Sequence, residues 1–186
     1  ADKAWPHCAR RHDCVPRRGI FAHPRTKPAG HADQSNRLFG SDRIMEKVIE
    51  TRLGSQQITT EKIVHFPRGL IGFESEHEFT LLQMRDDLPF LMLQSTTTPN
   101  VGLLVTDPYT FYPEYLIEIG DAEQKILQVT DREQLTVLVT LFVPPNKPEE
   151  TVMNLTGPIL INHVLKIGLQ VPQVDGKLPA QMLIKR

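Results

Sequence analysis

The sequence has almost no cysteine, no long hydrophobic run and few histidines outside its first part. Cys8 and Cys14 are the only cysteines among 186 residues, so the 142 residues from Met45 onward contain none and no disulfide framework can hold them together. No apolar run approaches the roughly 18 residues of a membrane span, and no apolar stretch of a secretory signal opens the chain. These absences predict a cytoplasmic protein that meets no membrane.

The common catalytic motifs are also absent. The chain has no phosphate-binding loop, dinucleotide fingerprint, nucleophile elbow or zinc-protease motif. His65, His77 and His163 are scattered over different segments, and Asp86 and Asp87 have the character of a turn. We therefore expect no enzyme activity, no catalytic residues and no cofactor.

The net charge of -1 conceals two oppositely charged parts. Residues 1–44 hold nine Lys/Arg and four Asp/Glu, whereas residues 45–186 hold twelve Lys/Arg and eighteen Asp/Glu. Affinity for a phosphate backbone comes mostly from Lys and Arg, so the acidic part is a poor nucleic-acid binder. It is better suited to a basic protein partner.

Residues 1–44 combine Arg, His, Pro, Gly and Asp with isolated apolar residues and no periodicity. Such a stretch cannot bury enough surface to offset its ordering entropy. We predict that residues 1–44 are a disordered basic segment. They were either added for protein expression or included because the start of the protein was misassigned, since Met45 precedes the first patterned segment. A native flexible basic arm is the alternative.

Four zinc-ligand types lie close together in this first segment, namely His7, Cys8, His12 and Cys14. Zinc needs its ligands held in a tetrahedron. Their spacing matches no standard finger, and no flanking hairpin or helix would hold the geometry. We predict no native metal site.

From Met45 onward short apolar and β-branched runs alternate with turn signals. The runs cover residues 48–51, 58–66 with a polar interruption, 79–83, 91–95, 101–106, 115–119, 136–143, 152–155, 159–161 and 167–171. Proline, glycine and aspartate pairs separate them at short intervals. Many short strands at this spacing favour an antiparallel sandwich or a closed barrel.

Two short helices are expected between these runs. Asp121 with Gln124 fits an N-cap and its partner three residues later, and Thr130 with Glu133 fits a capping box. Both helices must be short because β-like runs follow soon after.

The aromatic residues are most concentrated between residues 108 and 115. This stretch contains Tyr109, Phe111, Tyr112 and Tyr115, punctuated by Pro108 and Pro113. Large aromatic faces are favoured anchors at protein interfaces. The cluster either plugs one end of the β-domain or forms a partner-binding surface.

A second notable segment, residues 66–73, places Gly69 and Gly72 around two aliphatic residues, Leu70 and Ile71. Such glycines usually permit turns with positive φ or close packing. The segment is either a structural corner that closes the sheet or a turn that exposes Leu70 or Ile71 as a contact point.

At these residues the sequence resembles the FliW family of bacterial flagellar assembly factors. Six blocks match in order between residues 64 and 162: Val-His-Phe (64–66) with Gly-Leu-Ile-Gly-Phe-Glu (69–74), Phe (79) with Leu-Leu (81–82), Pro-Phe-Leu-Met-Leu-Gln-Ser (89–95), Asp-Pro-Tyr (107–109) with Tyr-Pro-Glu-Tyr (112–115), Thr-Val-Met-Asn-Leu (151–155) and Gly-Pro-Ile-Leu-Ile-Asn (157–162). The family often has proline at Ile71, aspartate at Glu114 and alanine at Gly157, and the tail from Val171 is less typical.

The resemblance implies a mainly β fold, a small antiparallel β-barrel-like domain over residues 45–186 with one or two short helices. It also implies a monomeric, non-enzymatic, cytoplasmic flagellar assembly factor with two partners, the RNA-binding translational regulator CsrA and flagellin. Binding CsrA would relieve its repression of flagellin translation, and flagellin would compete for the same protein. Motif position and aromatic clustering predict the partner-binding residues Leu70, Ile71, Phe73, Phe111, Tyr112, Pro113, Glu114 and Tyr115.

Two other functions remain as alternatives. A single-stranded nucleic-acid-binding barrel with a basic N-terminal arm could stack bases on the aromatic cluster, although the acidity of the domain argues against direct nucleic-acid binding. A small-molecule enzyme that uses the mouth of a barrel is a third interpretation, but the sequence offers no clustered nucleophile, base or metal set.

Overall fold

The computed structural model describes residues 45–52, 54–173 and 179–184. The predicted disordered segment 1–44, with the set His7, Cys8, His12 and Cys14, lies outside them. The strands are β1 (Glu46–Thr51), β2 (Gly54–Thr59), β3 (Ile63–His65), β4 (Glu78–Gln83), β5 (Phe90–Ser95), β6 (Gly102–Thr106), β7 (Leu135–Phe142), β8 (Val152–Met153), β9 (Ile159–Asn162), β10 (Ile167–Gln170) and β11 (Met182–Leu183). One α-helix, α1 (Asp121–Leu127), and four 3-10 turns, η1 (Thr60–Lys62), η2 (Pro108–Thr110), η3 (Arg132–Gln134) and η4 (Pro148–Glu150), complete the described part.

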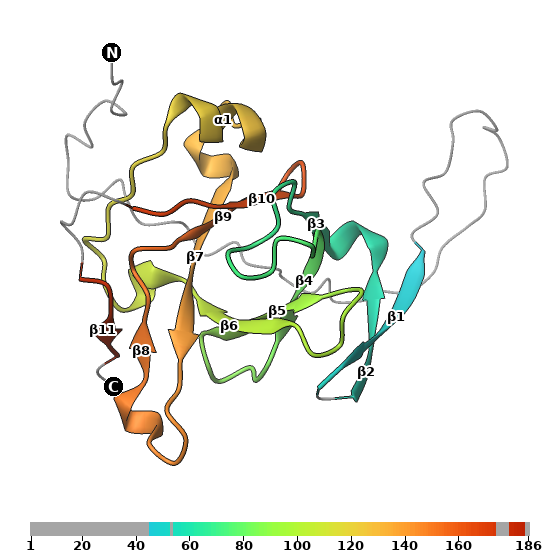
Figure 1. Cartoon of the computed structure of the whole chain (residues 1–186), viewed down its shortest axis with the longest axis horizontal. Helices are drawn as coiled ribbons and strands as arrows, with labels where there is room; N and C mark the ends of the chain where they lie inside the picture. Colours follow the sequence, from blue (N-terminus) through green and yellow to red (C-terminus); the bar gives the residue numbers. More distant parts are fainter. Residues whose placement is uncertain (1–44, 53, 174–178, 185–186) are drawn as a thin grey trace, which may run out of the picture. The chain divides into compact units, whose positions relative to one another are not determined.

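Seven of these strands close into a barrel (Figure 1). Their order is β7-β6-β5-β4-β3-β10-β9, and β9 pairs with β7 to complete the ring. Neighbours are antiparallel except β3 and β10, which run parallel. β8 and β11 extend the sheet outward from β7, and β1 and β2 form a separate hairpin. The predicted mainly β, antiparallel barrel-like domain is confirmed, and of the two sheet arrangements the closed barrel is the one that forms.

Strand β7 organises the interior because both faces of its middle part are buried. Leu138 packs into the barrel core with Phe66 and Phe79, whereas Val139 packs into a second cluster with Tyr115 and other residues outside the ring. A strand buried on both faces needs a nearly continuous apolar run, which explains the sequence Leu-Thr-Val-Leu-Val-Thr-Leu-Phe of β7. A third cluster, centred on Leu127, lies beneath α1.

The predicted helix caps are each displaced by one residue. Gly120 is the N-cap residue of α1, and Asp121 is its first helical residue. The second predicted helix is the 3-10 turn η3, and its capping box joins Asp131 and Gln134 rather than Thr130 and Glu133. The carboxylate of Asp131 accepts from the backbone of the turn, which a carboxylate does at least as well as a threonine hydroxyl.

The predicted strand over residues 115–119 is wrong, because the segment forms no strand ladder. Its side chains alternate as in a strand, with Tyr115 buried and Leu116 exposed. Part of its backbone pairs with a side chain instead: the N–H of Glu118 donates to Oε1 of Gln173 at 2.8 Å, and Nε2 of Gln173 donates to the carbonyl of Glu118 at 3.0 Å. The alternation of apolar residues over residues 115–119 therefore reflects an extended segment that packs on the barrel without joining its sheet.

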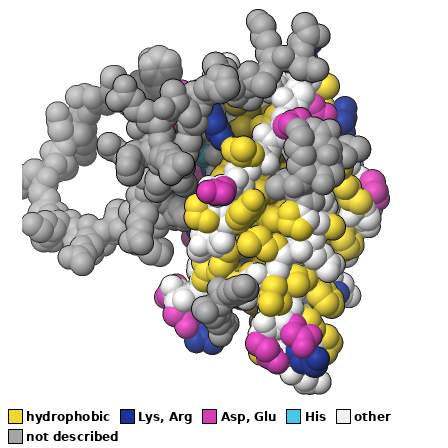
Figure 2. Space-filling model, turned by 90° about the vertical axis from the view of Figure 1, so that its left-hand side faces the viewer, with side chains coloured by type: hydrophobic (Ala, Val, Ile, Leu, Met, Phe, Trp, Pro, Cys, Tyr) yellow, Lys and Arg dark blue, Asp and Glu magenta, His cyan; other side chains and the backbone are white. Residues whose placement is uncertain are grey.

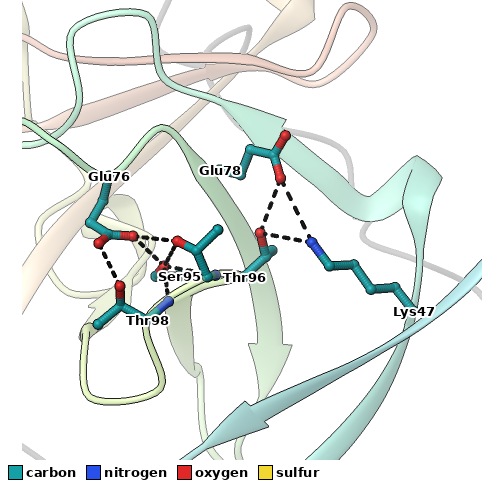
Figure 3. A network of polar contacts seen from close by, with 7 residues as sticks. Lys47, Glu76, Glu78, Ser95, Thr96 and Thr98 are labelled. Atoms are coloured by element: carbon teal, nitrogen blue, oxygen red, sulfur yellow. Dashed lines mark hydrogen bonds and ion pairs between the residues drawn. The ribbon is translucent and has the colours of Figure 1, made fainter.

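A polar network links the hairpin and the turn after β5 to the barrel wall (Figure 3). Lys47 of β1 lies 3.8 Å from the carboxylate of Glu78, and the hydroxyl of Thr96 donates to the same carboxylate at 3.2 Å. Glu76 accepts from three hydroxyls, those of Ser95, Thr97 and Thr98, each at 2.6 Å. The network thus holds the 95–98 turn by charge-assisted hydrogen bonds.

Candidate partner-binding surfaces

The turn over residues 69–73 is rigidly built and presents a single exposed aliphatic side chain. Gly69 and Gly72 both have positive φ, 65° and 84°, and Leu70 and Phe73 pair their backbones across the turn. Leu70 is only 1% exposed and anchors the turn in the barrel core, whereas Ile71 is 60% exposed. Of the two residues proposed as contact points here, Ile71 is therefore the one that a partner can reach.

Hydrogen bonds from distant residues fix the position of Ile71. Its N–H donates to Oε1 of Gln170 at 3.0 Å, across 99 residues of sequence. Nε2 of the same glutamine donates to the carbonyl of Gly157 at 3.2 Å. The N–H of Gly72 donates to the carboxylate of Glu74 at 2.9 Å, and this bond holds the pKa of Glu74 below its ordinary value. The turn is pre-ordered, so that a partner would spend little entropy on immobilising it.

Two adjoining hollows form a groove beside Ile71. Their volumes are about 450 and 340 Å³. The larger is lined by Ile71, Leu103, Thr140, Leu141, Asn154, Thr156, Gly157, Gln170 and Pro172. The smaller shares Thr140, Leu141, Asn154 and Thr156 with it and adds Phe142, Val152, Ala180 and Gln181. We call this surface the uncharged groove, since none of the described residues that line it carries a charge.

Phe142 and Val152, which line the smaller hollow, belong to a row of apolar side chains across three strands. Phe142, Val152 and Leu183 are direct neighbours in the pairing of β7, β8 and β11. Phe142 is 60% exposed and Leu183 is 46% exposed. Figure 2 shows the side of the molecule that carries β8 and β11, where hydrophobic side chains gather in the middle and charged ones lie toward the margin. Sequence reasoning missed this row, because nothing in the sequence tells which face β8 and β11 leave open.

The aromatic block, residues 109–115, is mainly a cover for the second core cluster. Tyr115 is 1% exposed, and its hydroxyl donates to the carbonyl of Leu155 at 2.6 Å. Burial raises the pKa of that hydroxyl well above its ordinary value. Tyr109 and Tyr112 are half-buried and pack their rings near Tyr115, with centroids 6.0 and 6.4 Å away. The ring of Tyr115 therefore packs within this cluster, and a partner cannot reach it in this conformation.

The predicted site residues lie in two separate places. Leu70 and Phe73 belong to the barrel core, whereas Phe111, Tyr112 and Tyr115 belong to the cluster outside the ring. Within the second group the exposed members are Pro113 and Glu114. The structure thus brings Ile71 to the uncharged groove, and none of residues 111–115 lines it.

No group of three or more His, Cys, Asp or Glu side chains among the described residues could hold a metal ion. His77 contacts the carbonyl of Phe66 through Nδ1 at 2.9 Å, which is a structural role. Burial raises the pKa of Asp107, whose carboxylate caps η2 by accepting from the N–H of Tyr109 at 2.8 Å.

No helix within the described ranges is long and apolar enough to span a membrane.

Residues 47–184 match the FliW protein family. The flagellar assembly factor FliW of Nitratidesulfovibrio vulgaris strain DP4 is 57% identical over 136 residues, 73% of this chain and 79% of that protein. That of Desulfovibrio desulfuricans is 50% identical over 127 residues, 67% of this chain and 76% of that protein. A crystal structure of the flagellar assembly factor FliW matches with a TM-score of 0.70 and 32% identity, over 74% of this chain and 96% of that one.

Proposed function

The chain belongs to the FliW protein family of flagellar assembly factors, and on this basis we propose that it acts in the cytoplasm, without catalysis, by binding CsrA and flagellin in turn. In this switch the protein holds CsrA away from flagellin mRNA. Flagellin that accumulates before export competes for the protein and frees CsrA to repress translation. Export of flagellin then reverses the exchange. The mechanism is a pair of linked binding equilibria and needs no chemical step.

Family membership is the observation that carries this proposal, and the surface chemistry supports it. Ile71 stands on a pre-ordered turn beside the uncharged groove, which is the kind of apolar anchor that protein interfaces use. The described residues also lack a metal-binding cluster. A binding role needs such a surface and no reactive group.

The charge of the domain suggests how CsrA would be kept from RNA. Residues 45–186 carry eighteen Asp/Glu against twelve Lys/Arg. An acidic domain docked on an RNA-binding protein repels the phosphate backbone at short range. If CsrA still loses its RNA to the same degree after several exposed Asp and Glu side chains are neutralised, this electrostatic contribution is absent.

The switch is tested by titrating the full chain with CsrA and with flagellin in separate calorimetric experiments, and then adding flagellin to the preformed CsrA complex. We expect saturable binding of each partner and release of CsrA. Binding of both partners at once, without displacement, would contradict the switch while leaving a binding role. Failure to bind either would contradict the proposed function.

A matched pair of variants locates the contact. Ile71→Ser removes an aliphatic side chain that is 60% exposed, and Val48→Ser removes one on β1 that is 64% exposed. If the Ile71 turn is a contact, Ile71→Ser weakens binding about tenfold or more, a difference of about 1.4 kcal/mol, and Val48→Ser does not. Equal binding by both variants would remove the turn from the interface.

A further inference from the structure

The turn over residues 69–73 contains the pattern of a type II β-turn. The N–H of Phe73 donates to the carbonyl of Leu70 at 2.8 Å, Gly72 has a φ of 84°, and Ile71 does not have a positive φ. Proline is favoured directly before the glycine of such a turn, because its ring fixes φ at about −65°. Isoleucine has no ring, so another restraint must hold Ile71 in place.

Gln170 of β10 supplies a restraint of this kind from a distant part of the sequence. Its Oε1 accepts from the N–H of Ile71 at 3.0 Å, and its Nε2 donates to the carbonyl of Gly157 at 3.2 Å. The backbone of Gln170 is itself held in the barrel, opposite Ile159 in the ladder of β9 and β10. We call these two side-chain hydrogen bonds the Gln170 brace. It connects the exposed turn to the barrel wall.

The charge of the domain favours one of the two partners in the proposed switch. Residues 45–186 contain eighteen Asp/Glu and twelve Lys/Arg. Arg68 precedes Ile71 in the chain, and Glu74 follows it with a carboxylate that accepts from the N–H of Gly72 at 2.9 Å. A domain of net negative charge attracts a basic surface. RNA-binding proteins present such a surface, and CsrA is the RNA-binding partner.

Resting on the proposed function, we propose that Gln170 is a positioning residue for CsrA, which holds the 69–73 turn in the conformation where Ile71 contacts that partner. Its effect passes through the turn and requires no contact between Gln170 and CsrA. Without the brace the turn would sample further conformations. CsrA would then bind only the fraction of molecules with a formed turn, and the apparent Kd would rise in inverse proportion to that fraction.

The chain offers a matched pair of glutamines for the test. Gln170→Met removes the brace and keeps an unbranched side chain of similar length. Gln173→Met is the control, because Gln173 makes the same two kinds of bond to another residue: its Oε1 accepts from the N–H of Glu118 at 2.8 Å, and its Nε2 donates to the carbonyl of Glu118 at 3.0 Å. Thermal unfolding followed by circular dichroism verifies that both variants fold.

Amide hydrogen exchange of the free protein, measured by NMR, reports on the turn without a partner. We expect the amides of Ile71 and Phe73 to exchange at least about fivefold faster in Gln170→Met and within about twofold of the parent in Gln173→Met. The amides of β4 and β5 serve as an internal reference, since a general loss of stability would accelerate them too. Unchanged exchange at Ile71 and Phe73, or equal acceleration in β4 and β5, overturns the proposal.

Calorimetry with CsrA and with flagellin, using the full chain, then measures the effect on binding. We expect Gln170→Met to weaken CsrA binding about three- to tenfold and Gln173→Met to change it less than about twofold. Added to Ile71→Ser, Gln170→Met should cost less than about a further twofold, because the contact that it positions is already gone. A full additional loss would mean that Gln170 acts on CsrA by another route, and would overturn the proposal.

The other outcomes separate this inference from the proposed function. If the parent binds both partners and Gln170→Met binds CsrA equally well, the inference is overturned while the switch stands. A loss of flagellin binding alone overturns the assignment of the turn to CsrA. If the parent binds neither partner, the proposed function fails, and the inference that rests on it fails as well.

Ile71→Pro tests the physical basis of the brace. Proline has no N–H to donate to Gln170, but its ring fixes φ without help. The exchange of the Phe73 amide in Ile71→Pro should therefore stay within about twofold of the parent, and adding Gln170→Met should leave it unchanged. If Gln170→Met accelerates Phe73 as much in the proline variant as in the parent, the side chain does not act through the N–H of Ile71, and the proposal is overturned.

Discussion

At the scale of single residues, two carboxylates near the surface show how hydrogen bonds let an acidic side chain stabilise a turn. Glu74 accepts from the N–H of Gly72, and Glu76 accepts from the hydroxyls of Ser95, Thr97 and Thr98. In both cases the bonds favour the ionised form and hold the pKa below its ordinary value of 4.5. Both carboxylates therefore stabilise turns of the fold.

Glu76→Gln should lower the free energy of unfolding at pH 7 by about 1–2 kcal/mol, because a neutral amide replaces a charge-assisted acceptor. A carboxylate whose pKa is lowered by folding contributes stability above its unfolded pKa and loses it as the pH falls through the folded pKa. The variant should therefore lose stability less steeply than the parent below about pH 4.5. Urea unfolding between pH 7 and pH 3 measures both effects.

Glu61→Gln is the control, since Glu61 is exposed and accepts no side-chain hydrogen bond from the described residues. It should match the parent across the same pH range within about 0.5 kcal/mol. Parallel pH profiles for Glu76→Gln and the parent would show that the hydroxyl network adds no acid-sensitive stability.

At the scale of elements, the 69–73 turn illustrates a conformation that only its glycines permit. Gly69 has a φ of 65°, and a Cβ there would lie 2.7 Å from backbone atoms of Phe73 and Glu74. Gly72 has a φ of 84°, but a Cβ there would meet nothing within 4 Å. A side chain at either position would be strained by the left-handed backbone, but only at Gly69 would it also overlap other atoms.

Gly72→Ala should cost about 1–2 kcal/mol of stability for the left-handed conformation. Gly69→Ala should cost a further 1–3 kcal/mol or so, because the turn must shift to remove the overlap. Urea unfolding of the two variants in parallel measures the difference. Equal losses of stability in the two variants would mean that the turn relaxes freely around Gly69. The description of Ile71 as pre-ordered would then be contradicted.

Sequence patterns predicted the elements well where burial follows the local period. The strongest predicted strand, residues 136–143, is β7 shifted by one residue. The predictions failed where the pairing partner lies elsewhere in the chain: residues 115–119 alternate like a strand but bond to Gln173. β2 begins with the polar run Gly-Ser-Gln-Gln, and β11 has only two residues, so neither carries a strand signal of its own.

At the scale of the whole molecule, closure of the barrel links segments that are far apart in sequence. β7 pairs with β6 on one side and β9 on the other. Leu138 of β7 is 2% exposed in the barrel core, whereas Leu116, outside the sheet, is 73% exposed. The two leucines provide matched substitutions inside and outside the ring.

Leu138→Ala should cost about 2–5 kcal/mol through lost burial and the cavity left behind. Leu116→Ala should change stability by no more than about 0.5 kcal/mol. Because Leu138 lies in the core that the strands of the ring share, we expect its variant to unfold in one transition, with coincident curves from far- and near-ultraviolet circular dichroism. Separate transitions, or a loss for Leu116→Ala as large as for Leu138→Ala, would contradict this description of the core.

The sequence by itself determined the β class, the places of most strands and the family resemblance, because hydrophobic period, turn residues and ordered motif blocks are local properties. It left two interpretations of the aromatic block and of the 69–73 turn. Tertiary structure decided that Tyr115 is buried and that Ile71 is exposed. It also created the uncharged groove, whose lining comes from segments between Ile71 and Gln181. Local patterns show that a strand has two faces, but only pairing and closure decide which face remains open to a partner.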